Sequence, residues 1–377
     1  MKKGRIGIAG AGIIGCMCAL KLAEDGWDVA LYDRASTPFT GVSSAGFGSL
    51  TPYSDPFFVG EARDFAARGV ALYKEEIFPA LPHGDIDLPA FEDSGLLQLC
   101  ESETDCDELR THVSLLISAG YKAQFISSAD VALLEPCLTC DIKGAALLDE
   151  PWIDRDILFN TLLESLNRKE TIKFYGLTTI IGISEEGDEA LLHLSTGERR
   201  SFDKIVVANG LNLYKLDGMS SFPMSYIRGD AIQVRTPNNM PLLRRHIYMN
   251  NGFITPRRDG RLLLGATYLE DNPAAVGSMR TDTIAVMQVI SLLEANRRIL
   301  PALETCEVDK MWRNWRSTPP DKMPILGAAH PTSTIVIATG FIGLGITMAP
   351  AVAAAVSHYF NSGDANQFPV SFSPNRF

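Results

Sequence analysis

The chain has 377 residues, of which 46% are hydrophobic and 21% are charged, a balance typical of a globular protein rather than a disordered one. This length is too great for a single small core and favours two domains. A formal net charge of −11 argues against a nucleic-acid partner, because nucleic-acid binding requires a basic surface. Seven cysteines exclude a fully paired disulfide framework, and their spread predicts unpaired thiols in a reducing compartment.

The first elements of the chain predict a dinucleotide-binding unit. An apolar strand at 5–9 is followed by a glycine-rich loop, an amphipathic helix and a second strand that ends at Asp33. Gly10 permits a tight turn, Gly12 lets the backbone approach a pyrophosphate, and Gly15 lets the helix pack on the strand. Asp33 lies 18 residues beyond Gly15, close to where an acidic residue accepts a hydrogen bond from a ribose hydroxyl. The motif does not separate NAD from FAD, because both carry the same ADP half, but its single occurrence predicts one bound dinucleotide.

The middle of the chain predicts helices mixed with antiparallel strands. We expect helices at 58–80, 128–135, 154–166 and 283–300. We expect strands at 144–148, at three places within 171–194, and at 204–208, 227–235, 245–255, 262–268 and 308–316. The arginine pairs at 257–258 and 244–245, with His246, are interpreted as solvated hairpin turns. Cys137 and Cys140 are interpreted as two unrelated thiols, and the scattered histidines predict no metal site.

The C-terminal part contains a long segment, 330–360, without Asp, Glu, Lys or Arg. Its length exceeds the roughly 20 residues that a membrane-spanning helix needs. Several glycines and Pro350 interrupt it, however, so it favours a buried strand at 334–339, a glycine turn and a buried helix from about residue 346.

A set of short motifs follows along nearly the whole chain in a recognisable order. They are the N-terminal glycine motif and the segments 43–48, 228–229, 252–257, 265–267, 312–316, 320–321, 324–327 and 340–350. In this combination the chain resembles the FAD-dependent D-amino acid oxidase superfamily, in particular its glycine oxidase and D-amino acid dehydrogenase branches. The resemblance implies an α/β fold, with a Rossmann-like FAD-binding domain and an α+β substrate domain that contains an antiparallel sheet. The expected domains are discontinuous: 1–88, 142–222 and 308–377 for FAD, and 89–141 and 223–307 for the substrate.

The resemblance also implies which residues hold FAD. The ADP half would contact Gly10, Gly12, Ile13, Ile14, Gly15, Asp33 and Arg34, with a backbone contact from Thr179 near the adenine. The phosphate and ribityl groups would contact Val42, Ser43 and Ser44, and the isoalloxazine ring would lie along Phe47, Gly48 and Ser49. The pyrimidine end would meet the backbone of Gly340, Gly343, Leu344, Gly345, Ile346 and Thr347. Asn314 stands where sarcosine oxidases attach the flavin through a cysteine, so we expect non-covalent FAD.

The substrate residues implied by the resemblance centre on Arg316, which would form a bidentate pair with the substrate carboxylate. Phe253 and Tyr268 would line the substrate pocket. Phe253 stands where glycine oxidase usually has tyrosine, so one hydroxyl partner of the carboxylate is missing. Gly343 stands where glycine oxidase has a second arginine, which leaves Arg316 as the cationic anchor and widens the range of substrates beyond glycine.

The implied reaction is oxidation of the C–N bond of a small amino acid: glycine, an N-substituted glycine or a D-amino acid. Hydride transfer to flavin N5 would give an imine, which hydrolyses to an oxo acid and an amine. Dioxygen or a quinone would accept the electrons. Two alternatives stay open: an FAD-dependent enzyme that oxidises 2-hydroxy acids, and a flavin subunit of a larger dehydrogenase complex. We expect a cytoplasmic protein, with peripheral membrane association and homo-oligomerisation left open.

Overall fold

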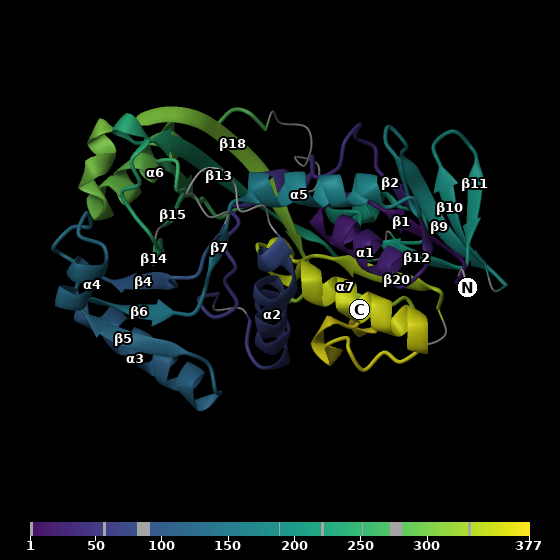
Figure 1. Ribbon diagram of the computed structural model, residues 1–377, viewed down its shortest axis with the longest axis horizontal. Helices are drawn as coiled ribbons and strands as arrows, with labels where there is room; N and C mark the ends of the chain where they lie inside the picture. The colour runs from purple at the N-terminus through teal and green to yellow at the C-terminus, as the bar shows by residue number, and fades with distance from the viewer. Residues whose placement is uncertain are drawn as a thin grey trace.

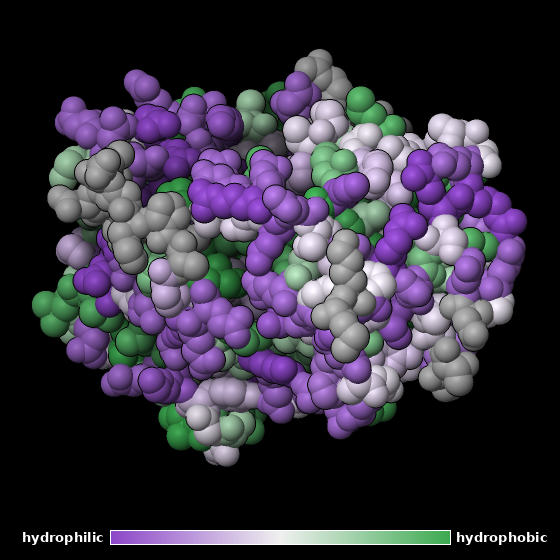
Figure 2. Space-filling view, turned by 45° about the vertical axis from the view of Figure 1, so that its right-hand side comes forward, coloured by the Kyte–Doolittle hydropathy of each residue, from purple (hydrophilic) through white to green (hydrophobic). Residues whose placement is uncertain are grey.

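A computed structural model of the chain describes residues 3–55, 58–80, 91–187, 189–219, 222–250, 252–271, 281–330 and 333–377. The elements gather around two large β-sheets, and the long strands β13 and β18 run from one region toward the other (Figure 1). Hydrophilic side chains predominate on the face shown in Figure 2, where hydrophobic ones form small separate groups. This surface agrees with the charged composition of the chain.

The first sheet has six strands and is parallel except for one edge strand. Its order is β19-β20-β12-β1-β2-β8, and β19 alone runs antiparallel to its neighbour. The strands are β1 (Arg5–Ala9), β2 (Asp28–Tyr32), β8 (Ile172–Tyr175), β12 (Lys204–Val207), β19 (Ile325–Ala328) and β20 (Ile335–Thr339). The inner strands are almost uninterrupted apolar runs because elements cover both faces of the sheet.

One face of this sheet is covered by helices and the other by a small antiparallel sheet. The helices are α1 (Ile13–Glu24), α5 (Arg155–Arg168) and α7 (Gly345–Ser362). The small sheet contains β9 (Ile180–Glu186), β10 (Glu189–Leu194) and β11 (Arg199–Phe202). Because side chains alternate along a strand, Ile6 and Ile8 of β1 pack in the helix-side core, whereas Ala9 packs in the core against the small sheet. The Rossmann-like fold expected for the N-terminal part is confirmed.

The second sheet has nine strands among the described residues and is antiparallel apart from the β14–β4 pair. Its order is β17-β13-β16-β15-β14-β4-β6-β5, with β18 also paired to β13. The strands are β4 (Leu96–Cys100), β5 (Ala123–Ser127), β6 (Gly144–Leu148), β13 (Ser225–Arg235), β14 (His246–Met249), β15 (Gly252–Pro256), β16 (Arg261–Gly265), β17 (Leu269–Asp271) and β18 (Glu307–Thr318). A separate two-stranded sheet pairs β3 (Phe91–Glu92) with β7 (Trp152–Ile153).

The remaining helices are α2 (Glu61–Leu72), which continues as a π-helix over Tyr73–Ile77, α3 (Glu103–Ser118), α4 (Ser128–Leu134) and α6 (Val286–Ile299). Short 3₁₀ turns lie at Val42–Ala45, Phe78–Ala80, Gly210–Lys215, Pro237–Asn239, Pro301–Thr305, Val370–Phe372 and Pro374–Arg376. Reciprocal hydrogen bonds between Ser102 and Asp105, and between Ser127 and Asp130, begin α3 and α4 as capping boxes. None of the helices in the described ranges combines the length and the apolar run that a membrane crossing requires.

Two predicted elements differ from the structure. The strand expected at 245–255 is a hairpin of two strands, β14 and β15, because its apolar pattern continues across a tight turn that ends at Gly252. The helix expected at 58–80 begins at Glu61 and changes to π and then to 3₁₀ geometry. The division into two discontinuous domains remains a proposal. Within it, β6 bonds to β4 and β5, and β18 bonds to β13, so both strands belong to the larger sheet.

The structure contains a disulfide. Cys100, at the end of β4, is bonded to Cys106 in the first turn of α3, which departs from the reducing compartment that the spread of the cysteines predicted. The capped start of α3 folds back on β4 and brings the two α-carbons to 5.2 Å. Cys137 and Cys140 are free thiols, as the sequence predicted.

Candidate active site

A cavity of about 1820 Å³ is lined by residues from both large sheets. Sites for small ligands usually measure roughly 300–1,000 Å³. This cavity therefore has room for a dinucleotide together with a second, smaller molecule. Its lining contains the glycine loop that follows β1 at one end and side chains of β14, β15 and β18 at the other.

The glycine loop permits a close approach between α1 and β1. Gly10 has a φ of 106°, and a Cβ at that position would lie 2.3 Å from the carbonyl oxygen of Ala208. A Cβ at Gly15 would lie 1.9 Å from the carbonyl oxygen of Gly10. No acidic side chain lies in the first turn of α1, and Gly12 at its N-cap offers no side chain. The positive end of the helix dipole therefore faces the cavity wall, where it favours an anion such as a phosphate.

The carboxylate of Asp33 braces this loop. One oxygen accepts a hydrogen bond from the backbone N–H of Ala11 at 2.8 Å, and the other accepts one from Ala35, also at 2.8 Å. The hydroxyl of Ser43 accepts a third bond, from the N–H of Ile13 at 2.9 Å. Side chains that the sequence assigned to ligand contacts thus also fix the shape of the loop. Each oxygen of the Asp33 carboxylate retains a second lone pair that can accept from a hydroxyl donor.

The start of α7 forms a second helix terminus at the same cavity. Gly340 and Ile342 both have positive φ values, 75° and 47°, which turn the chain from β20 into the helix. The first turn of α7 has no acidic residue, and its N-cap Leu344 provides no side-chain hydrogen bond. Two helix N-termini whose own N-cap residues provide no side-chain hydrogen bond therefore line one cavity, and both favour negative charge there.

The face of the nine-stranded sheet that lines the cavity carries an aromatic wall. The strand register places Tyr248 of β14 directly opposite Phe253 of β15, and Phe253 opposite Gly265 of β16. The rings of Tyr248 and Phe253 are stacked with centroids 5.8 Å apart, and Phe253 meets the edge of Phe47 at 4.6 Å. A side chain at Gly265 would collide with Phe47 and Phe253, so this glycine makes room for both rings.

Arg316 lies beside this wall, on β18. Its guanidinium group lies against Gly229, where a Cβ would come within 2.7 Å of Nη1, and Nη1 donates to the carbonyl oxygen of Thr267 at 3.4 Å. Burial lowers the pKa of Arg316, and the nearby Tyr248, Tyr268 and Asp55 oppose that shift. A guanidinium carries five N–H donors. Arg316 therefore brings a half-buried positive charge and a donor fork to the cavity that it lines.

Three basic residues predicted in solvated turns are buried, so that interpretation is wrong. The side chain of Arg257 is 3% exposed, and its Nε lies 3.4 Å from Asp154. Burial lowers the pKa of Arg257 to about 10, and Asp154 opposes the shift. Arg245 pairs with the buried Glu135, and His246 places Nδ1 3.0 Å from the hydroxyl of Ser49. Each is buried because a distant segment supplies its partner.

Comparison with known proteins identifies the family. A family model for FAD-dependent oxidoreductases matches residues 5–359. The chain belongs to this family. It is 26% identical over 372 residues to the glycine oxidase of Bacillus subtilis (strain 168), a match that covers 96% of this chain and 94% of the relative.

Solved structures show the same fold. The glycine oxidase from Geobacillus kaustophilus has a TM-score of 0.87 with 23% identity and covers 100% of both chains. The L-proline dehydrogenase from P. horikoshii has a TM-score of 0.84 with 18% identity and covers 100% of this chain and 98% of its own. The chain is therefore an FAD-dependent oxidoreductase, and its cofactor is FAD.

The residues around the cavity fit this cofactor. Its diphosphate suits the start of α1, where the N-cap Gly12 has no side chain, and the start of α7 provides a second positive helix end. The expected cofactor residues that line the cavity are Gly10, Gly12, Ile13, Ile14, Asp33, Arg34, Val42, Ser43, Phe47, Gly48, Ser49, Thr179, Gly340, Gly343, Leu344, Gly345 and Ile346. Arg316, Phe253 and Tyr268 line it as well, and Tyr268 is 45% exposed.

Three expected cofactor residues do not line the cavity. Gly15 packs α1 against the glycine loop, close to Gly10. The hydroxyl of Ser44 donates to the carbonyl oxygen of Gly41 at 2.8 Å, and that of Thr347 donates to Ser49 at 3.4 Å. These residues shape the wall of the cavity, and the proposal that they contact FAD has no support from their placement.

The sequence analysis missed Tyr248 in this FAD-dependent oxidoreductase. Burial raises the pKa of Tyr248 to about 12, so its phenol is neutral and can donate a hydrogen bond at neutral pH. Because Tyr248 is paired with Phe253 across the β14–β15 hairpin, it brings to this wall the hydroxyl that Phe253 lacks. The interpretation of 245–255 as one strand hid this pairing, since a single strand places the two residues far apart.

A buried carboxyl group, Glu150, holds the segment that leads to the cavity-lining Asp55. One oxygen of Glu150 accepts hydrogen bonds from the backbone N–H groups of Tyr53 and Ser54. Burial raises the pKa of Glu150 to about 7, and the N–H groups of Ser54 and Tyr53 oppose the shift. The charge of Glu150 therefore changes near neutral pH.

This shift predicts a pH-dependent stability. The folded protein keeps the proton of Glu150 up to about pH 7, whereas an unfolded chain loses it near the ordinary value of 4.5. The stabilisation from this proton is thus complete below the unfolded pKa and is lost as the pH rises through the folded pKa. Glu150→Gln mimics the protonated acid, so the variant should gain at least about 1 kcal/mol of unfolding free energy over the wild type between acidic and mildly alkaline pH.

Urea unfolding of both proteins across this pH range measures that effect. The wild type should lose stability relative to Glu150→Gln as the pH rises, with the steepest change between the unfolded value of 4.5 and the folded value of about 7. A constant difference between the two proteins at every pH would show that the carboxyl does not titrate there.

Among the described residues, no group of three His, Cys, Asp or Glu side chains could hold a metal ion.

Proposed function

We propose that the chain oxidises the C–N bond of a small amino acid: glycine, an N-substituted glycine or a D-amino acid. One observation carries this proposal: the guanidinium of Arg316, which packs against Gly229, lines the same cavity as the dinucleotide loop. A fork of N–H donors matches a carboxylate in charge and geometry. The relatives named glycine oxidase support the choice of an amino acid, and Gly343 removes the side chain that would add a second cation.

The protein residues then orient the substrate. Arg316 holds the carboxylate, and the hydroxyl of Tyr248 donates a second hydrogen bond to it. The rings of Phe253 and Phe47 exclude water from the side of the cavity on which they lie. When bound, FAD supplies the acceptor for the two electrons and the proton that leave the substrate as hydride. Holding the α-carbon at a fixed place and orientation is the contribution of the protein.

The products follow from this orientation. Loss of hydride from the α-carbon leaves an imine, which water hydrolyses to an oxo acid and ammonia, or to a primary amine where the nitrogen carried a substituent. We infer non-covalent FAD, since Asn314 stands at the position of the expected attachment and no cysteine of the described residues lines the cavity. Dioxygen or a quinone accepts the electrons in the second half of the reaction.

Product analysis tests this function. The FAD-bound protein is incubated with glycine, sarcosine, D-alanine and D-proline, and separately with lactate and glycerol 3-phosphate. The proposal predicts an oxo acid for at least one amine substrate, with ammonia or a primary amine in equal amount. Peroxide with and without an added quinone then identifies the acceptor. Turnover of lactate with none of the amino acids would contradict the proposal and favour a 2-hydroxy acid enzyme.

A further inference from the structure

The segment 44–49, of which 45–49 line the cavity, is here called the flavin loop, and a donor outside the segment bonds to each of its carbonyl oxygens. Two guanidinium groups and three other donors make these six bonds. The pairs are Arg155 with Ser44 and with Gly46 (3.0 Å), Trp312 with Ala45 (3.3 Å), Arg257 with Phe47, the N–H of Ile153 with Gly48 (2.9 Å), and Thr347 with Ser49 (3.4 Å). Because every carbonyl of six consecutive residues is hydrogen-bonded, the orientation of this backbone is fixed.

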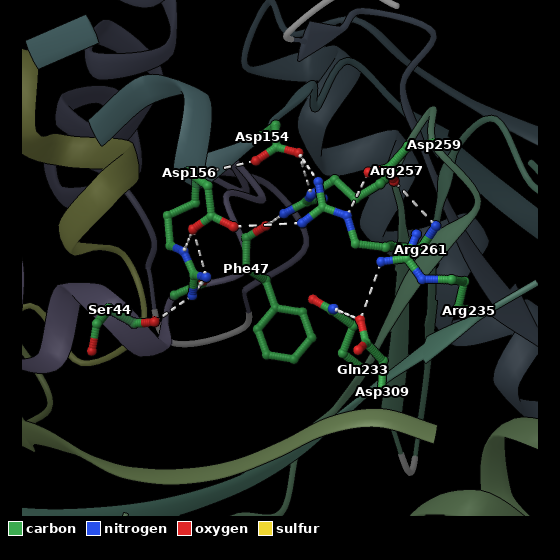
Figure 3. Close-up of polar contacts among 12 residues, drawn as sticks. Ser44, Phe47, Asp154, Asp156, Gln233, Arg235, Arg257, Asp259, Arg261 and Asp309 are labelled. Atoms are coloured by element: carbon green, nitrogen blue, oxygen red, sulfur yellow. Dashed lines mark hydrogen bonds and ion pairs between the residues drawn. The ribbon is translucent and has the colours of Figure 1, made fainter. Parts of the chain in front are cut away.

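The two guanidinium groups belong to a network of alternating charges (Figure 3). Arg155 pairs with Asp156 at 2.8 Å, and Arg257 lies 3.4 Å from Asp154. Arg261 connects these two ion pairs, because its guanidinium lies 2.8 Å from Asp154 and 3.5 Å from Asp156. Buried charges persist only when they are paired, and each member of this network has a partner of opposite sign. The network comes from the start of α5 and the hairpin after β15, neither of which carries the flavin loop.

Arg257 is placed to fix the orientation of the flavin loop more strongly than Arg155. It is almost fully buried, and its guanidinium carbon lies 5.3 Å from the ring centroid of Trp152. Its Nη2 donates to the carbonyl oxygen of Phe47, while its Nε lies beside Asp154. A charge-assisted hydrogen bond in such surroundings is about twice as strong as a neutral one. Arg155 is less buried, with 16% of its side chain exposed.

We propose that Arg257 and Arg155 are positioning residues that tune the redox potential of FAD through the flavin loop. Both arginines donate hydrogen bonds to carbonyl oxygens of the flavin loop from the side opposite the cavity. These bonds keep the carbonyl oxygens pointing away from the cavity. The flavin gains negative charge on reduction, and carbonyl oxygens turned toward it would oppose that charge. The arginines therefore favour reduced over oxidised FAD. This inference rests on the proposed contact between the loop and the ring, and it is independent of the substrate.

Three variants test the proposal. Arg257→Gln and Arg155→Gln each remove a guanidinium from the loop carbonyls. Arg261→Gln is the matched control, because Arg261 binds the same two carboxylates but none of the carbonyls of the flavin loop. For each protein, the midpoint potential of bound FAD is measured by titration against a dye of known potential. The affinity for oxidised FAD is measured by fluorescence titration of the apoprotein.

We expect the two loop variants to bind reduced FAD about tenfold less well relative to oxidised FAD, which appears as a lower midpoint potential. Arg261→Gln should lose stability and keep the wild-type potential. A wild-type potential in both loop variants, or an equal shift in Arg261→Gln, would overturn the proposal. If Arg257→Gln does not fold, Arg155→Gln alone decides. The proposed function is tested by product analysis of the wild type, so a failure of the present proposal leaves the proposed function standing.

Discussion

Replacing Arg316 with alanine is expected to lower kcat/KM for the amino acid substrate by about two to four powers of ten. The estimate follows from the loss of two charge-assisted hydrogen bonds to the carboxylate, each worth about 1.5–3 kcal/mol. Arg316→Lys should recover only part of the loss, because lysine keeps the charge but not the fork. Steady-state kinetics of FAD-loaded proteins with equal flavin content measures the effect.

A surface arginine supplies the control for this experiment. Arg235 lies on β13, next to β18, and pairs with Asp309 while 39% of its side chain is exposed. Arg235→Ala should leave kcat/KM within about twofold of the wild type, because exposed ion pairs contribute little. Ordinary kcat/KM in Arg316→Ala would show that another group holds the carboxylate, and the substrate assignment would then fail.

Replacing Asp33 with alanine is expected to weaken FAD binding by at least about a hundredfold. The carboxylate accepts hydrogen bonds from the N–H groups of Ala11 and Ala35, and each such bond to a charged acceptor is worth about 1.5–3 kcal/mol. Without the carboxylate, the glycine loop loses the two hydrogen bonds that fix its shape, and the ribose of FAD loses its expected hydrogen-bond acceptor. Fluorescence titration of the apoprotein with FAD gives the dissociation constant.

The control for Asp33 is Glu164→Ala on α5, which removes an exposed carboxylate that pairs with Arg168 on the same helix. Its dissociation constant for FAD should equal that of the wild type. The account of the loop would be contradicted if Asp33→Ala bound FAD as tightly as the control.

The dinucleotide half of the site could be predicted from the sequence because its constraints are local. Gly15 is required by its contact with Gly10 inside one strand–turn–helix unit, the positive φ of Gly10 makes the turn of that unit, and Asp33 follows the next strand and bonds back to the turn at Ala11. Such contacts leave a fixed spacing in the chain. The antiparallel sheet was also predictable, since its turn at 257–260 carries an obvious signal.

The substrate half depends on contacts between distant segments, which a single sequence does not reveal. Tyr248 matters only because the hairpin pairs it with Phe253. Arg257 was assigned to solvent because its neighbours are polar, yet Asp154, far away along the chain, holds it in the interior. Burial of a charged residue is set by the partner that another element brings, and no local pattern records that partner.

Anaerobic reduction of the bound flavin decides whether an amino acid is the substrate and whether Arg316 holds it. The purified FAD-bound protein is mixed without oxygen with glycine, N-substituted glycines and D-amino acids in turn, and the visible flavin absorbance is followed. The account predicts that at least one of these compounds bleaches the flavin in the wild type and does so far more slowly in Arg316→Ala. A flavin that stays oxidised with every amine, or that bleaches at the same rate in both proteins, would contradict it.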